Sequence, residues 1–203
     1  MKRFLYRLKL RQKILGGFGL ILLLLALSAV VSNVMIVQIN GNVDQIINRE
    51  TKQMIDATNL NLRVTQVNSN LRGYLLTADD EQIQLAKQRL ADVGELKNRV
   101  LAAVSDGEVK EKLNQLDQWS ALISEQLMPA IEARNHDVAT AILSHQVVPV
   151  ARVVQEGLDA HLNQKQENVV RLGAQAVQKG HQTLMTNSIV SVAAIVLGIL
   201  IAF

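Results

Sequence analysis

The segment between Lys13 and Asp44 contains no charged residue, and this gap constrains the fold more than any other feature of the chain. Within it, residues 14–36 are almost wholly apolar, with a run of leucines at the centre. An α-helix rises about 1.5 Å per residue, so a stretch of this length spans a hydrocarbon core of about 30 Å. We therefore predict a first transmembrane helix over residues 14–36.

A second uncharged apolar stretch runs from Leu184 to Phe203 and predicts a second transmembrane helix over residues 183–203. Each segment has an alternative interpretation. The first segment could be a cleaved signal peptide, but its apolar run exceeds the usual length of about 7–15 residues and Ala26-Leu27-Ser28 is a poor cleavage site. The second could be a buried core helix, but the bundle predicted below leaves it no core to enter.

The basic N-terminus predicts the orientation. Residues 1–13 contain six basic and no acidic residues, namely Lys2, Arg3, Arg7, Lys9, Arg11 and Lys13. By the positive-inside rule this segment lies in the cytoplasm, so residues 37–182 lie outside the cell membrane, which means the periplasm if the source is a Gram-negative bacterium. We expect a two-pass protein of the bacterial inner (cytoplasmic) membrane, with the lipid bilayer as a partner.

Charge and composition exclude several functions. The chain has a formal net charge of +3, and removing the six N-terminal charges leaves −3 for the rest. A mildly acidic body removes the main support for nucleic-acid binding. The sequence has no cysteine, which excludes disulfides, cysteine-based zinc sites and thiol chemistry. Few aromatic residues and only two prolines favour long packed helices.

The region after the first apolar segment repeats apolar residues at helical spacing. Steps of three and four residues, as in a heptad pattern, connect the members of each series. The four series are Ala57, Leu60, Val64, Val67, Leu71, Tyr74 and Ala78; Ile83, Ala86, Leu90, Val93, Leu96, Val100 and Val104; Val109, Leu113, Leu116, Ile123 and Leu127; and Leu143, Val147, Val150, Val154 and Leu158, continuing more loosely through Leu162, Val169, Leu172 and Ala176.

Short polar breaks separate the series and carry residues that begin helices. Asp79 and its neighbours offer capping side chains, Ser105-Asp-Gly-Glu108 has the spacing of a capping box, and Asn135 or Asp137 can cap the last helix. We predict helices over about residues 37–78, 80–105, 107–134 and 137–182. Short turns between long helices predict an all-α, antiparallel up-down-up-down four-helix bundle.

The predicted first and fourth helices are the longest, each roughly 60–70 Å, whereas the middle two are nearer 40 Å. We therefore expect the long helices to extend beyond the bundle as a two-helix stalk. Each continues into a transmembrane segment, so a small shift or rotation in the outer domain can reach the membrane.

No set of side chains predicts catalysis, a cofactor or a metal. The four histidines have irregular spacing, which predicts solvated helix faces for His136, His145, His161 and His181. Pro129 and Pro149 fall inside the third and fourth helices, where each removes a backbone hydrogen bond and bends the helix. They are either tolerated irregularities or the sign of an opened bundle where a ligand sits. We predict that the chain is not an enzyme.

Three segments resemble the sensory module of methyl-accepting chemotaxis proteins, and together the resemblance covers nearly the whole chain. They are residues 8–25, residues 71–80, and residues 137–143 with Pro149 after them. The resemblance implies a homodimer that senses a small molecule, or a ligand-loaded periplasmic binding protein, outside the cell. It also implies a signal passing through the second membrane helix to a HAMP linker and a kinase-controlling coiled coil, before which this sequence ends.

The resemblance also implies a ligand site. Amino-acid receptors of the family use arginines on helix 1 from both subunits and a threonine after a proline on helix 4. Arg63 and Arg72 match two of those arginines in spacing, whereas Asn68 replaces the middle one and Val150 the threonine. These departures argue against an aspartate- or serine-type specificity. We expect the ligand near Arg63, Asn68, Arg72 and Val150 at a dimer interface, where converging guanidinium groups would favour an anion.

Three functions compete at this point. The first is the sensory and transmembrane module of a chemoreceptor. The second is the same module heading a sensor histidine kinase or a diguanylate cyclase. The third is a structural tether without a ligand, which ligand-induced stabilisation would distinguish from a sensor.

Overall fold

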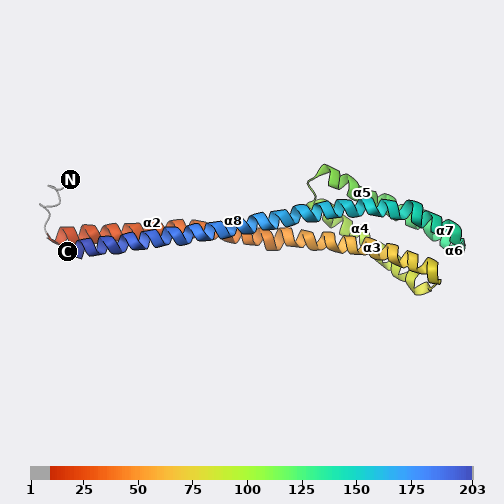
Figure 1. Cartoon of the computed structure of the whole chain (residues 1–203), viewed down its shortest axis with the longest axis horizontal. Helices are drawn as coiled ribbons and strands as arrows, with labels where there is room; N and C mark the ends of the chain where they lie inside the picture. The colour runs from red at the N-terminus through yellow and green to blue at the C-terminus, as the bar shows by residue number, and fades with distance from the viewer. Residues whose placement is uncertain (1–9, 203) are drawn as a thin grey trace. The chain divides into compact units, whose positions relative to one another are not determined.

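The computed structural model describes residues 10–202, and this part of the chain contains helices and no strand (Figure 1). The chain divides into two compact units. Unit 1 combines the N-terminal residues up to Ile46 with the residues from Val170 onward, and unit 2 is Ile47–Val169. The basic residues at positions 2–9 lie outside the described residues.

Unit 1 is a pair of antiparallel helices, α2 (Leu10–Asp44) and the C-terminal part of α8 (Val148–Ala202). Half-buried residues three or four apart face the partner helix: Ile21, Leu24, Ser28, Ser32, Met35 and Ile39 in α2, and Thr183, Asn187, Val190, Ala194 and Leu197 in α8. The remaining faces expose large apolar side chains such as Leu23 and Ile195. Helices that are apolar all round suit a lipid environment.

Polar side chains connect the two helices of unit 1. The hydroxyl groups of Ser28 and Ser32 both donate to Oδ1 of Asn187, over 2.7 and 2.8 Å. The hydroxyl of Thr183 lies 3.0 Å from Sδ of Met35. Hydrogen bonds of this kind hold helices together where lipid provides no hydrophobic driving force.

Two helices are long and apolar enough to cross a membrane. They contain the stretches Ile14–Thr77 and His136–Ile199, and their most apolar windows include no buried residue. These stretches include the predicted spans 14–36 and 183–203, apart from the last residues of the chain. The exact boundaries at 36/37 and 182/183 remain predictions.

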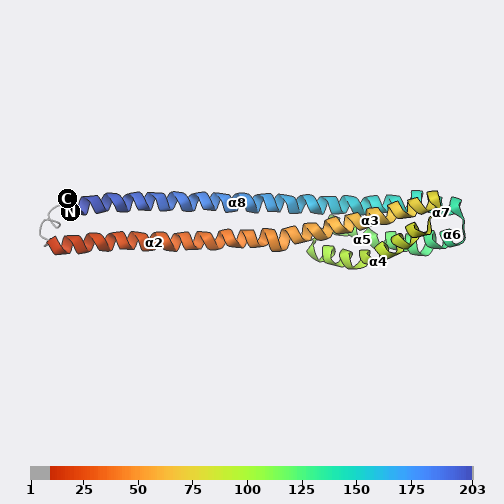
Figure 2. The same ribbon diagram turned by 90° about the horizontal axis from the view of Figure 1, so that it is seen from below.

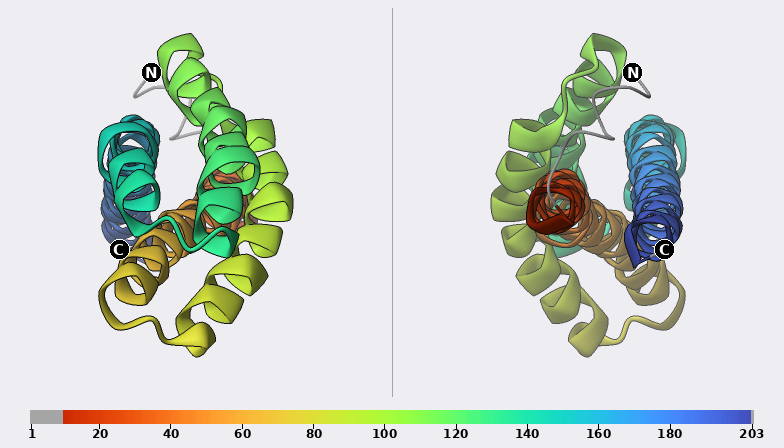
Figure 3. Two further views of the ribbon diagram at one scale, coloured as in Figure 1. Left: turned by 90° about the vertical axis from the view of Figure 1, so that its right-hand side faces the viewer. Right: turned by 90° about the vertical axis from the view of Figure 1, so that its left-hand side faces the viewer.

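Unit 2 contains the four helical segments of the predicted bundle. The first is η1 (Gln45–Thr51) with α3 (Lys52–Thr77), and the second is α4 (Asp80–Ala103). The third joins α5 (Gly107–Ala121), η2 (Leu122–Leu127) and α6 (Met128–Glu132). The fourth joins α7 (His136–Ile142), η3 (Leu143–Val147) and the start of α8. The chain reverses direction at each turn (Figure 2), and the segments surround a shared interior (Figure 3).

The interior of unit 2 confirms the predicted apolar series. Five successive members of the first series, Ala57 to Leu71, have no exposed surface, and most members of the other three are buried. Tyr74, Leu90, Val150 and Leu162 are partly buried against this core. The core also includes Trp119 and Leu122, which the third predicted series had skipped. The fold class, an all-α four-helix bundle, is therefore confirmed.

The turns between helices follow the expected chemistry with two corrections. Asp79 accepts a hydrogen bond from the backbone N–H of Glu81, and Asn135 accepts one from Val138. The capping box at Ser105 is wrong, because Asp106 is the cap and its carboxylate accepts from two backbone N–H groups. Ala78, expected in the first apolar series, is exposed and ends α3 in the left-handed conformation, with φ 54°.

Each proline follows a wide helical turn. η2 ends just before Met128 and η3 just before Val148, and each of these residues donates its N–H to the carbonyl five positions earlier. Pro129 and Pro149 come next, where an ordinary α-helix would need an N–H that proline lacks. The bends predicted at the prolines therefore take the form of π-helical turns, and η2 and η3 pack against each other.

Candidate ligand-binding cleft

A cleft of about 340 Å³ lies on unit 2 between α3 and α4. Its lining consists of Asn59, Leu62 and Arg63 from α3 and of Asp92, Glu95, Leu96 and Arg99 from α4. The cleft exists because the buried stripes of α3 and α4 pack together while longer polar side chains flank the contact. One of the predicted ligand residues, Arg63, therefore lies in a cleft.

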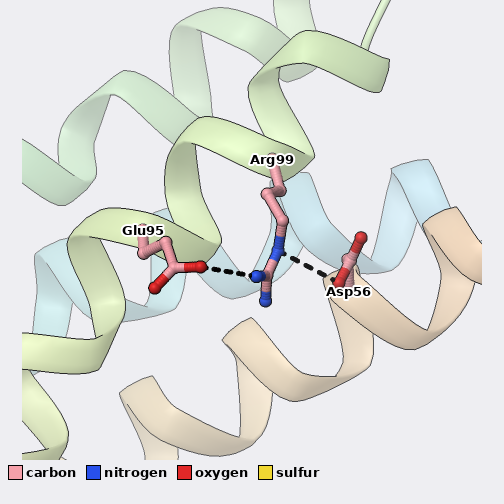
Figure 4. Close-up of polar contacts among 3 residues, drawn as sticks. All are labelled: Asp56, Glu95 and Arg99. Carbon is pink, nitrogen blue, oxygen red and sulfur yellow. Dashed lines mark hydrogen bonds and ion pairs between the residues drawn. The ribbon is translucent and has the colours of Figure 1, made fainter.

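Ion pairs connect the walls of the cleft. Nε of Arg63 lies 3.4 Å from Oδ2 of Asp92, and its NH1 group donates to Gln66 over 3.2 Å. Arg99 of α4 bridges to both helices: its Nε lies 3.3 Å from Asp56 on α3, and its NH1 lies 2.7 Å from Glu95 (Figure 4). Both arginines thus have carboxylate partners within the subunit.

These pairs remain accessible to solvent. The Arg63 and Asp92 side chains are 37% and 48% exposed, and those of Arg99 and Glu95 are 46% and 79% exposed, whereas Asp56 is 18% exposed. Exposed ion pairs contribute only about 0–1 kcal/mol each, because water screens them. A ligand carboxylate could therefore replace Asp92 at the Arg63 guanidinium at little cost to the fold.

The other predicted ligand residues point to different neighbours. Asn68 accepts a hydrogen bond from Nε1 of the buried Trp119 over 3.3 Å, so it faces α5. Arg72 is exposed near the end of α3, and Val150 packs against the hydrophobic core. Of these four residues, Arg63 alone lines this cleft.

The histidine prediction is right for three residues and wrong for one. His136, His145 and His181 are exposed, but His161 is only 1% exposed. The signal was present in the sequence, since Val154, Leu158, His161 and Lys165 continue the steps of four, three and four along α8. The predicted series instead continued through Leu162, so it left out His161 and Lys165.

His161 lies beside a buried ion pair. Oε2 of Glu50 on η1 and Nζ of Lys165 on α8 are 3.3 Å apart, and these side chains are 4% and 10% exposed. Burial lowers the pKa of His161 below its usual value, and the positive charge of Lys165 lowers it further, whereas Glu50 raises it. His161 is therefore neutral at neutral pH.

Comparison with known proteins agrees with this architecture. The family model described as a four-helix-bundle sensory module for signal transduction matches residues 7–179. The comparisons found no significant match among curated proteins or among solved structures. Since the family match covers most of the sequence and all of unit 2, the chain belongs to the four-helix-bundle sensory modules of methyl-accepting chemotaxis proteins.

Proposed function

We propose that this chain is the sensory and transmembrane part of a chemoreceptor, which detects a small molecule outside the cell and controls chemotaxis. The observation that carries the proposal is the link between a sensory bundle and apolar helices. α8 begins inside the bundle and is a single helix up to Ala202, so it includes most of the predicted second span. A continuous helix is suited to transmit a small displacement.

The chemistry of the cleft favours a ligand with a carboxylate group. Arginine binds carboxylates through a planar pair of N–H donors. Arg63 pairs with Asp92 across the cleft through Nε alone, while its NH1 group donates to Gln66, so a ligand carboxylate could displace Asp92 and engage a pair of N–H donors. A second subunit could bring its own Arg63 or Arg72 to the same ligand, as the family resemblance implies.

The direct experiment is isothermal titration of the full chain in nanodiscs against a panel of organic acids and amino acids. For a compound that binds, Arg63→Ala should weaken the affinity about tenfold or more, because a hydrogen bond to a charged group is lost. Arg72→Ala tests the second arginine in the same way. Lys110→Ala, which removes an exposed charge from α5, should leave binding unchanged. Equal affinity in wild type and both arginine variants would place the site elsewhere.

We further propose that the functional unit is a homodimer formed through α3 and η1. Three large apolar side chains on these elements are about half exposed or more: Ile47, Ile55 and Leu62. The bundle does not cover them, and Leu62 also lines the charged cleft. A dimer contact at Leu62 would therefore place the cleft beside the second subunit.

Disulfide crosslinking tests this interface cleanly because the chain has no native cysteine. In membranes, Ile55→Cys and Leu62→Cys should form disulfide dimers under mild oxidation. Gln118→Cys, at an exposed position of α5, is the control and should remain monomeric. Crosslinking at position 118 without crosslinking at 55 or 62 would assign the dimer contact to another helix.

A further inference from the structure

Both ring nitrogens of His161 are buried and lack a hydrogen-bond partner among the described residues. A neutral imidazole carries one donor and one acceptor, so this arrangement leaves two polar groups without compensation. Burial of such groups is unfavourable, and exceptions in folded proteins call for a reason. Stability therefore gives no reason for a histidine at this position of the helix pattern.

The surroundings of His161 contain one negative and one positive charge. Lys165 lies four residues later on the same face of α8, and Glu50 reaches across from η1 to pair with it. Both are close enough to act on the charge of His161. The carboxylate of Glu50 thus has two neighbours that can carry a positive charge, Lys165 and His161.

Besides η1, the start of α5 also packs against this part of α8. Gly157 lies against Val109 and Lys112, and since α5 and α8 are antiparallel, His161 lies one turn further on, level with the turn before α5. The acids there are already engaged, because Asp106 caps α5 and Glu108 pairs with Lys112 over 3.2 Å. Glu50 is the acid whose charge acts on His161, and it already pairs with a cation at this level of α8.

We propose that His161 is a proton-binding site. When its imidazole is protonated, the carboxylate of Glu50 exchanges its ion pair with Lys165 for an ion pair with the imidazolium. A proton from solvent adds to a ring nitrogen, and no other bond forms or breaks. The imidazole is held inside on a short side chain, whereas the long, flexible side chain of Lys165 can carry its ammonium group out to water. Lys165 is therefore the cation that leaves.

The exchange changes how η1 is attached to α8. Glu50 would shift by one turn along α8, from position 165 to position 161, and it belongs to a π-helical turn at the end of unit 2. Acidification would thereby alter the pairing of the two helices that leave the bundle. That the proton comes from outside the cell rests on the proposed function, but the exchange itself does not.

The test is an NMR titration of the histidine ring signals of the full chain in nanodiscs, with an unfolded histidine peptide as the reference. The imidazole of His161 should titrate at lower pH than that of the reference peptide, because burial and the charge of Lys165 lower its pKa. Glu50→Gln should lower the pKa of His161 further, and Lys165→Met should raise it, because the first removes a negative charge and the second a positive one. Titration of His161 at the pH of the reference peptide, insensitive to both substitutions, would overturn the proposal.

Hydrogen exchange measures the structural response. After correction for the intrinsic pH dependence of exchange, the amides of residues 45–51 should change their protection between pH 7.5 and about 5 in the wild type. His161→Gln, which cannot titrate, should abolish the change, and the exposed-site control His145→Gln should retain it. An equal change in His161→Gln would show that the proton acts elsewhere. Neither measurement requires the sensory ligand, so failure here is distinct from failure of the proposed function.

Discussion

Gly157 shows how one missing side chain sets the distance between two helices. A Cβ atom at this position would lie 2.8 Å from Cβ of Lys112 and 3.5 Å from the carbonyl oxygen of Val109, both on α5. Neither of these atoms is the end of a flexible side chain, so α5 would have to move. The absence of a side chain at residue 157 allows α8 to pack closely against α5.

Replacing this glycine should therefore destabilise the bundle. We expect Gly157→Ala to lower the free energy of unfolding by about 1–3 kcal/mol through overpacking. Gly94 is the matched control, since it is an exposed helical glycine with no atom near the position of an added Cβ. Gly94→Ala should stabilise the protein by about 0.5–1 kcal/mol. Denaturant unfolding followed by circular dichroism measures both, and equal effects would contradict the close approach.

Asn68 is a second residue whose role can be measured. Its side chain receives the indole N–H of Trp119, which has no exposed surface. Asn68→Ala would leave a buried donor unpaired and should cost about 1–3 kcal/mol of stability. Ser69→Ala, at the neighbouring exposed position, should change stability by less than about 0.5 kcal/mol. If Asn68→Ala left the free energy of unfolding unchanged, the hydrogen bond to Trp119 would not contribute to stability.

At the scale of elements, the π-helical turns η2 and η3 are the clearest departure from regular helices. Each holds one residue more than an α-helical turn and ends two residues before a proline. A proline inside a regular helix clashes with the carbonyl four residues earlier and costs about 3 kcal/mol. The wide turn opens the helix at that carbonyl, so η3 and Pro149 are two parts of one arrangement.

This pairing predicts that two changes compensate each other. Deleting the exposed residue Gln146 should narrow η3 to an α-helical turn, and Pro149 should then destabilise the helix by roughly 3 kcal/mol. Adding Pro149→Ala to the deletion should recover much of that loss. The melting temperatures of the single and combined variants form a double-mutant cycle. Strictly additive effects would show that the wide turn has another cause.

The sequence predicted the helices and their apolar faces well because the heptad steps are nearly unbroken. Residues such as Leu60, Val67 and Leu113 were assigned to the core and are fully buried. The burial of His161 was missed because residue type was weighed above position in the pattern. The π-helical turns were missed because proline indicates a disturbance without specifying its geometry. Of the candidate ligand residues, Arg63 lines a cleft, but its pairing with Asp92 joins two helices and no spacing in one helix predicts it.

At the scale of the whole molecule, the topology across the membrane is the property on which a sensory role depends. The proposed arrangement places residues 1–13 in the cytoplasm and the bundle outside. The turn between α4 and α5 includes Ser105, whose side chain is exposed. It is therefore a suitable reporter for the outer side.

Single-cysteine labelling can test the topology. In intact cells with a permeabilised outer membrane, Ser105→Cys should react with a thiol reagent that cannot cross the inner membrane. Lys2→Cys should react only after the inner membrane is disrupted. Because the native chain has no cysteine, background labelling should be absent. Labelling at position 2 together with protection at position 105 would reverse the proposed orientation.

The hydrogen bonds between α2 and α8 set the register of the two helices along their axes. Ser28 and Ser32 are one helical turn apart, about 6 Å along the axis, yet both hydroxyl groups reach the same oxygen of Asn187. Moving α8 along α2 in either direction lengthens one bond as it relaxes the other. The two serines thus pull Asn187 in opposite directions along the helix axis, which restores the register of α2 and α8 after a small displacement.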